Sequence, residues 1–236
     1  MTLSAFQTRF LEPEDISALM DLEHSKWELQ QVAGRELMLQ RISAYPELSI
    51  GTFCARTGQS LASLFMRPVN PAIFTAPTKW ETAARVDGAC AAHSCGRSLF
   101  GISLSSNHPE AVKAIFKFFY PRALKAGWRD VYLGSPIPGF RKARQKNPDL
   151  SVWEYVHAKR NFHADEPLDP QLKYYFMKGF RQIISIQENY FPHAESLNYG
   201  VILRSVIPLS RPRHLWRITP LSVIESFSIM GLWLAR

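Results

Sequence analysis

The chain has 236 residues, of which 46% are hydrophobic and 20% are charged, and its net charge at pH 7 is +8. This composition supplies enough apolar material for a core and excludes repeat and low-complexity architectures. A pI near 9.5 favours an acidic partner, such as nucleic acid, an anionic membrane, a phosphorylated cofactor or an acidic protein. Charge alone does not choose among these partners, and the chain could also be a basic protein with no special partner.

The chain contains three cysteines, Cys54, Cys90 and Cys95. An odd number gives no disulfide framework, and the first residues lack the apolar core of a secretory signal, so we expect a cytoplasmic location. The stretch CAAHSC combines two of these cysteines with His93, but its spacings differ from those of zinc ligand pairs and no second pair follows. We therefore expect no metal site.

The first half of the chain alternates between strand-like and helix-like patterns. Hydrophobic periodicity predicts a strand at 6–12, helices at 13–27 and 34–46, and strands at 48–56 and 60–69. Thr57, Gly58 and Gln59 separate the last two runs and are typical of a hairpin.

The longest predicted helix spans residues 107–127 and follows a strand at 98–106. Pro109 suits its first turn, and Gly127 lies just past its end. A further strand follows at 129–135. Strand, helix and strand together predict a right-handed crossover between two parallel strands.

Two short helices with clear boundaries precede the last strands. Ser151 and Glu154 form a capping box, and the stretch LDPQLKYYFMKGF begins a second helix at Asp169 and stops it at Gly179. Strands follow at 180–188 and 199–206. The element order predicts an α/β domain over residues 1–208, with a mixed, mostly antiparallel central sheet and flanking helices.

Residues 209–236 have a different character: a basic, proline-punctuated linker leads into an apolar segment. Ser226–Ala235 is too short to span a bilayer. We interpret it as a packing helix, with contact to a membrane surface or a partner protein as the alternative.

Three stretches in sequence order resemble a known family. They are the hairpin strands followed by SLFGISLSS and a long helix, then YLGSPIPGF, then DPQLKYYFMKGF with ENYFPHAESLNYGVIL. The arrangement resembles the GNAT superfamily of acyltransferases over about residues 8 to 204. The last two stretches are similar to a branch that includes predicted long-chain N-acyltransferases and the GNAT-like loading domains of polyketide synthases. The resemblance implies transfer of an acyl group from a pantetheine thioester to a small-molecule amine.

The resemblance also assigns a role to Tyr175, which stands four residues before the glycine of YYFMKGF. In GNAT enzymes a tyrosine at this position often protonates the departing thiolate, and a neutral phenol suits that task at pH 7. The alternative is a core aromatic, because Tyr175 follows Leu172 by one helical turn. Tyr174 points elsewhere on the same helix.

A glycine-rich turn between strand and helix usually holds the pyrophosphate of acyl-CoA in GNAT proteins. Here the junction reads SSNHPEAV: it has no glycine, Pro109 removes one amide, and Glu110 repels an anion. The resemblance further implies that amides of a splayed strand bind the thioester oxygen. These expectations place the donor thioester against Ile102, Ser103, Leu104, Ser105, Asn107 and His108.

The missing turn favours an acyl carrier protein (ACP) over coenzyme A as the acyl donor, with no tightly bound cofactor. ACP presents the same phosphopantetheine arm without the nucleotide pyrophosphate, and its acidic surface suits the net charge of +8. The basic stretch FRKARQK is the predicted docking surface, and a solvated loop is the alternative. Its docking residues would be Arg141, Lys142, Arg144 and Lys146.

The acceptor amine must lose a proton, and water is a common base in this superfamily. The residues whose types could replace water are Glu28, His108, His157 and His163.

A decarboxylating branch of the loading domains has histidine in place of Tyr175 and arginine in an NY-R-P turn. Here the turn reads NYFP, and Phe191 favours an apolar acyl pocket over a site for malonyl decarboxylation. Three further functions stay open: a catalytically silent GNAT-like module that binds a carrier protein, a polyketide-starter S-acyltransferase, and a nucleic-acid binder. The sequence has no stacking or groove-reading motif for the last of these.

Overall fold

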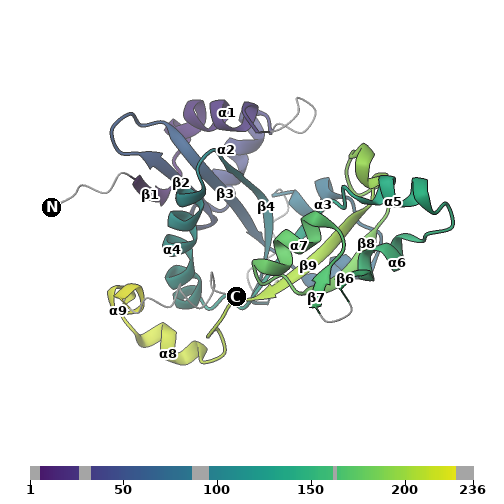
Figure 1. Ribbon diagram of the computed structural model, residues 1–236. Coiled ribbons are helices and arrows are strands. Elements are labelled where there is room, and N and C mark those ends of the chain that lie inside the picture. The colour runs from purple at the N-terminus through teal and green to yellow at the C-terminus, as the bar shows by residue number, and fades with distance from the viewer. Residues whose placement is uncertain (1–5, 27–32, 87–95, 162–163, 227–236) are drawn as a thin grey trace.

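The centre of the molecule is a seven-stranded sheet with helices on both faces, shown in Figure 1. The computed structural model describes residues 6–26, 33–86, 96–161 and 164–226. The strand order is β1-β2-β3-β4-β5-β9-β8, and every neighbouring pair is antiparallel except β4 and β5. These strands are β1 (Phe6–Phe10), β2 (Ser49–Cys54), β3 (Ser60–Pro68), β4 (Ser98–Ser106), β5 (Asp130–Ser135), β8 (Gln182–Gln187) and β9 (Gly200–Val206). The predicted mixed, mostly antiparallel sheet is confirmed.

Two apolar clusters cover the two faces of the sheet. Neighbouring strand residues such as Leu99 and Phe100 belong to different clusters, as the alternation of side chains along a strand requires. We call the two faces the α1 face and the α4 face. The α1 face carries α1 (Ile16–His24), α2 (Arg35–Ala44) and α3 (Trp80–Ala84); the α4 face carries α4 (Pro109–Ala126), α5 (Phe140–Lys146), α6 (Val152–His157) and α7 (Pro170–Met177).

The local signals of α6 and α7 are seen in the structure. The Ser151 hydroxyl accepts a hydrogen bond from the Glu154 amide, and the Glu154 carboxylate accepts one from the Ser151 amide, which completes the predicted capping box. Asp169 caps α7, and Gly179 follows the helix with φ of 90°, in the left-handed region. A two-stranded ribbon, β6 (Lys159–Asn161) with β7 (Ala164–Pro167), lies between these helices and has no counterpart among the predicted elements.

The stretch FRKARQK forms the short helix α5, so the loop interpretation is wrong. Phe140 explains the difference, because its side chain is only 1% exposed and packs edge-on against Tyr199 and at a tilt against Tyr155. Three of the basic residues that follow it, Lys142, Arg144 and Lys146, remain exposed. An apolar anchor therefore holds a basic helix against the domain.

The C-terminal region packs on α4 through two helices, α8 (Arg213–Ile218) and α9 (Leu221–Ser226). Ile224 is buried in the α4-face cluster, and Glu225 forms a 2.7 Å ion pair with Arg122 of α4. Residues 227–236, with nearly all of the predicted apolar segment, lie outside the described residues. Among the helices that are described, none has the length and apolar character needed to cross a membrane.

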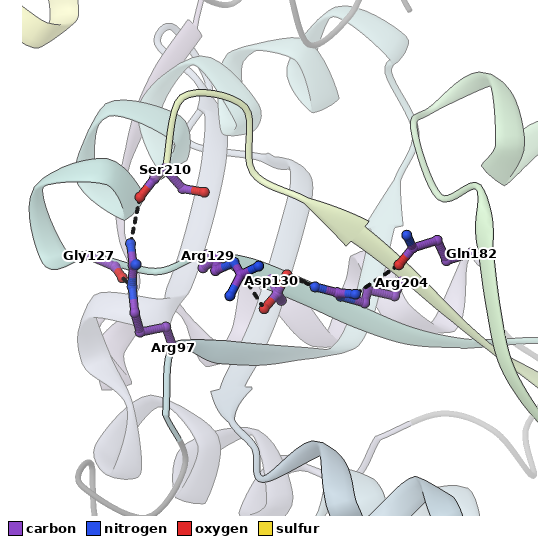
Figure 2. A network of polar contacts seen from close by, with 7 residues as sticks. All are labelled: Arg97, Gly127, Arg129, Asp130, Gln182, Arg204 and Ser210. Carbon is purple, nitrogen blue, oxygen red and sulfur yellow. Dashed lines mark hydrogen bonds and ion pairs between the residues drawn. The ribbon is translucent and has the colours of Figure 1, made fainter. Parts of the chain in front are cut away.

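Polar contacts clamp one end of the parallel β4–β5 pair (Figure 2). Arg204 of β9 donates two hydrogen bonds, of 3.1 and 2.7 Å, to one carboxylate oxygen of Asp130 at the start of β5. Arg97, just before β4, donates to the carbonyls of Gly127 and Ser210 at 2.5 and 2.6 Å. Three separate parts of the chain are thereby fixed to the beginning of the two parallel strands.

Candidate active site

The central feature of the site is the point where β4 and β5 separate. The two strands pair only from Ser98 opposite Asp130 to Gly101 opposite Leu133. Both strands continue beyond this point, β4 to residue 106 and β5 to residue 135, without pairing to each other. A register shift in the β3–β4 ladder at the same level bends β4 away. The pair is therefore closed at its clamped end and open at the other.

The open edge of β4 presents backbone amides. The Asn107 amide donates to the Leu61 carbonyl at 3.0 Å, so it points toward β3. N–H groups alternate between the two edges of a strand, which directs the amides of Leu104 and Ser106 toward the open side. Leu104 is one of the four strand residues predicted to meet the thioester, and its amide is directed to the open side. Ser106 joins it, and no side-chain signal in the sequence could have identified a backbone donor.

The junction between β4 and α4 is organised by a serine in place of glycine. The Ser106 hydroxyl accepts from the His108 amide and lies 2.9 Å from the His108 carbonyl oxygen, to which it donates. That carbonyl also accepts the amides of Ala111 and Val112, and Pro109 has no amide to offer. The first turn of α4 is therefore largely satisfied within the chain, which leaves it a poor cradle for a pyrophosphate.

The two junction residues have mainly structural contacts. The Asn107 side chain bonds to Ser25 at the end of α1, with its amide nitrogen 3.0 Å from the hydroxyl. The His108 ring packs edge-on against Phe6, and its Nδ1 has no hydrogen-bond partner among the described residues. Both side chains tie the β4–α4 loop to neighbouring elements.

Tyr175 lies on α7, partly buried against the α4-face cluster. In Figure 1, α4 lies on one side of β4 and α7 on the other. The Tyr175 ring meets Phe180 and Tyr174 edge-on, with centroids 6.0 and 5.4 Å away. Burial raises the pKa of the Tyr175 phenol, so it carries its proton at neutral pH. Tyr174, by contrast, is 50% exposed.

The Asp169 carboxylate holds α7 in place. One of its oxygens accepts the amides of Gln171 and Leu172, at 2.9 and 3.2 Å. The other accepts the Gly139 amide at 3.0 Å and the Tyr155 hydroxyl at 2.8 Å. Asp169 is fully buried; desolvation of Tyr155, together with this carboxylate, raises the pKa of the Tyr155 phenol. A single side chain thus joins α7, α6 and the start of α5.

The basic helix α5 borders a pocket of about 460 Å³. Arg141 is held beside it by a 2.8 Å hydrogen bond from its Nε to the Ala194 carbonyl. The pocket is lined by Arg141, Arg144, Gln145, Pro148 and Leu197. The structure therefore brings two of the four predicted docking residues to one concave surface.

Phe191 lies on the opposite face of the sheet from Tyr175. Its ring packs edge-on against Tyr190, with centroids 5.2 Å apart, at the margin of the α1-face cluster. Tyr190 is 1% exposed and lies flat on the glycines of β5 and β9: a Cβ at Gly134 would come 2.3 Å from its ring, and one at Gly200 would come 2.2 Å from it. Glycine is needed at both positions to admit this ring.

Two buried charged residues on the α1 face escaped the sequence prediction. Glu23 and Arg41 are each 2% exposed, and the Ser105 hydroxyl donates a short hydrogen bond to Glu23. Burial raises the pKa of Glu23 and lowers the pKa of Arg41 to about 10. A signal existed, because Glu23 follows Leu19 by four residues and Arg41 follows Met38 by three, which puts each charge on its helix's apolar face.

Of the candidate bases that the structure describes, His108 lies at the β4–α4 junction and His157 on α6. His157 stacks on Trp153 of the same helix, with centroids 4.4 Å apart, and its Nδ1 lies 2.9 Å from the Trp153 carbonyl oxygen. Glu28 and His163 lie outside the described residues, as do Cys90, His93 and Cys95 of the CAAHSC stretch.

Comparison with solved structures identifies the architecture. The GphF GNAT-like decarboxylase, solved with isobutyryl-CoA, superposes with a TM-score of 0.66 and 22% identity over 85% of this chain and 99% of its own. The loading GNATL domain of CurA from Lyngbya majuscula gives a TM-score of 0.65 and 17% identity over 86% and 98%. The chain has the GNAT fold. No family model and no curated protein matches the sequence.

A third structural neighbour is a malonyl-CoA decarboxylase from Agrobacterium vitis. It has a TM-score of 0.59 and 11% identity, over 94% of this chain and 67% of its own. At such identities the likeness establishes the fold alone. Any function of this chain therefore depends on its own residues at the open β4–β5 pair and on the helices that flank it.

Proposed function

We propose that this protein transfers an acyl group from a phosphopantetheine thioester to an amine, and that acyl-ACP is its preferred donor. The observation that carries the proposal is the open edge of β4, where the Leu104 amide faces the gap between β4 and β5. Tyr175, whose phenol keeps its proton at neutral pH, is the proposed acid and belongs to α7, which lies on the other side of β4 from α4 in Figure 1.

The chemistry needs two groups that this arrangement offers. The amine nitrogen bonds to the thioester carbonyl carbon while an amide such as that of Leu104 stabilises the negative charge on the oxygen. The C–S bond then breaks, and the thiolate takes the phenolic proton of Tyr175. A proton given up by the amine nitrogen restores the phenol. The products are an amide and a free thiol.

The preference for ACP follows from the first turn of α4 and from α5. The amides of Ala111 and Val112 are occupied by the His108 carbonyl, which weakens any grip on the pyrophosphate of coenzyme A. The basic surface of α5 and its pocket of about 460 Å³ offer an acidic carrier protein a place to dock. A small-molecule amine would be the acceptor, and the reaction would need no tightly bound cofactor.

Decarboxylation of a malonyl-type thioester is the second candidate. It is favoured by two of the fold neighbours, which are decarboxylases. Against it, Tyr175 stands where the decarboxylating branch has histidine, and Phe191 replaces the arginine of the turn. Phe191 packs on Tyr190 at the margin of the apolar α1-face cluster, with the His193 ring 6.2 Å away, and its own side chain brings no charge to pair with a carboxylate.

The test is to mix the protein with acyl-ACP or acyl-CoA and an amine panel, and to follow the acyl group by intact-mass spectrometry. We expect faster acyl loss from ACP, with a mass gain on the amine. Tyr175→Phe should lower kcat about 100-fold with little change in melting temperature, because general acids contribute about 10² to 10⁴. Tyr174→Phe, on the same helix but exposed, is the matched control and should retain full activity. Unchanged turnover in Tyr175→Phe would exclude the acid role, and loss of carbon dioxide without amide would favour decarboxylation.

A further inference from the structure

Residues 209–223, which include α8 and the start of α9, expose several large apolar side chains, and we call them the C-terminal face. Ile218 is 80% exposed, Leu215 51%, Leu209 47% and Val223 41%. Leu215 and Ile218 stand three residues apart on α8, so they lie on one side of that helix. Single exposed apolar residues are ordinary in proteins, whereas a group of them in one segment marks a surface that meets another body.

The inner side of this segment is fixed to the domain. Trp216 packs against the α4-face cluster, and its Nε1 donates to the Leu209 carbonyl at 2.6 Å. Lys125 of α4 donates to the carbonyls of Arg217 and Thr219 at the end of α8, both at 2.8 Å. The exposed apolar side chains are therefore presented by a segment that is anchored to α4.

The C-terminal face is also basic. Residues 207–226 contain three arginines, Arg211, Arg213 and Arg217, and all three are exposed. The same stretch contains one acidic residue, Glu225, whose charge is already paired with Arg122 at 2.7 Å. The charge that this segment presents to its surroundings is therefore positive.

Two further arginines extend this positive charge toward the start of the parallel strands. Arg97 donates to the Ser210 carbonyl at 2.6 Å, which fixes it beside the C-terminal face (Figure 2). Burial, and then the nearby charges of Arg213 and Arg129, lower the pKa of Arg97, and Asp130 offsets part of this effect. Guanidinium groups that repel one another in this way favour an anionic partner.

The position of this face separates it from the predicted carrier-protein surface. Figure 1 shows α8 and α9 beside one end of α4, on the other side of the molecule from α5. Apolar and basic residues alternate along the face, as in Leu209, Arg211 and then Leu215, Arg217. The boundary layer of an anionic bilayer matches this mixture, because it offers phosphates to guanidinium groups and acyl chains to apolar side chains.

We propose that the C-terminal face binds the surface of an anionic membrane. Leu215 and Ile218 enter the apolar layer, while the arginines of the face contact lipid phosphates. The contact is a surface contact, since none of the described helices has the length and apolar character to cross a bilayer. The sequence after α9 reads FSIMGLWLAR, which is apolar and has no acidic residue, so the same chemistry continues along the chain. Binding of this kind is independent of the proposed acyl transfer.

The first experiment measures cosedimentation of the full chain with lipid vesicles. The vesicles consist of phosphatidylcholine alone or of an equimolar mixture of phosphatidylcholine and phosphatidylglycerol. A basic residue at an anionic surface strengthens partitioning about fivefold, so several of them together should give at least about 10-fold stronger binding to the mixed vesicles. Added salt should weaken this binding, because it screens the attraction. Equal binding to both kinds of vesicle, or binding to neither, would overturn the proposal.

The second experiment changes the arginines. Arg211→Gln combined with Arg217→Gln should weaken binding to the mixed vesicles about 10- to 30-fold. Arg35→Gln combined with Arg56→Gln is the matched control, because it removes the same net charge from exposed positions elsewhere in the chain. Equal losses in the two double variants would show that net charge alone attracts the protein to the vesicles, and the C-terminal face would have no special role.

The third experiment changes the apolar contact. Ile218→Ser should weaken binding to the mixed vesicles about 10-fold, because an isoleucine that enters the apolar layer no longer contributes. Its side chain is 80% exposed, so the melting temperature should stay the same. Ile184→Ser, at a 37% exposed position on β8, is the control and should bind like the unsubstituted protein. Unchanged vesicle binding in Ile218→Ser, or loss of a concentration-dependent dimer in its place, would overturn the proposal; the second result would assign the face to contact between two copies of the chain.

Discussion

Asp169 provides a sharp test of how α7 is held in place. Its carboxylate accepts four hydrogen bonds, from the amides of Gln171, Leu172 and Gly139 and from the Tyr155 hydroxyl. Asp169→Asn has nearly the same shape, but its amide nitrogen cannot accept a hydrogen bond. If the remaining oxygen keeps the two α7 amides, the amide nitrogen faces the Gly139 N–H, and the charge that strengthens all four bonds is gone.

The expected loss of stability follows from these contacts. An unsatisfied buried donor costs about 1–3 kcal/mol, and hydrogen bonds to charged groups contribute about 1.5–3 kcal/mol each. We expect Asp169→Asn to lower the free energy of unfolding by about 2–4 kcal/mol, a large part of the ~5–15 kcal/mol of a typical protein. Tyr155→Phe removes only one donor and should cost about 1–2 kcal/mol.

Urea denaturation at neutral pH measures both values, with an unchanged m-value as the sign that the comparison is valid. Asp165→Asn is the control, because that carboxylate is 91% exposed and its ion pair with Lys159 is long, at 3.8 Å. A cost for Asp169→Asn no greater than that of the control would show that the four contacts do not determine the position of α7. A large cost together with unchanged kcat would show that Tyr175 does not need that position.

Three further predictions concern packing, pH and the donor. Gly134→Ala should lower stability by about 1–3 kcal/mol, because its Cβ would come 2.3 Å from the Tyr190 ring; an unchanged melting temperature would contradict this packing. Burial alone would raise the pKa of Asp15, but hydrogen bonds from Arg9 and the Glu12 amide lower this pKa overall. The contribution of Asp15 to folding stability is therefore present above its ordinary pKa of about 3.9 and is lost as pH falls through the lower pKa of the folded state. Asp15→Asn should therefore reduce the pH dependence of stability measured by denaturation below about pH 4, and an identical profile would refute the pairing. Reversing Arg141 and Arg144 to Glu should raise KM for acyl-ACP several-fold but leave kcat with a short pantetheine thioester unchanged. Raising salt from roughly 50 to 300 mM should likewise raise KM for acyl-ACP in the unsubstituted protein, because salt screens the attraction. Equal losses with both donors would mean that α5 shapes the active site.

Much of the fold could be predicted from the sequence because its signals are local. The cap at Asp169, the stop at Gly179 and the capping box of Ser151 with Glu154 depend on hydrogen bonds within a few residues, so the residue types alone indicate them. Strand and helix periodicity likewise reflects which side chains must be buried in each segment. Element order and the single parallel crossover then followed from general rules of chain topology.

The site depended on contacts that no local pattern contains. The separation of β4 from β5 is set by a register shift against β3 and by the clamp at Asp130, between residues far apart in the chain. The basic stretch after Gly139 forms a helix that is anchored by Phe140, whose ring packs against those of Tyr155 and Tyr199. Glu23 and Arg41 carry charges that alone would predict exposure, and only the packing of α1 and α2 against the sheet buries them. Burial and proximity are properties of the tertiary structure, and they decide which of the many polar residues in a sequence can act on a substrate.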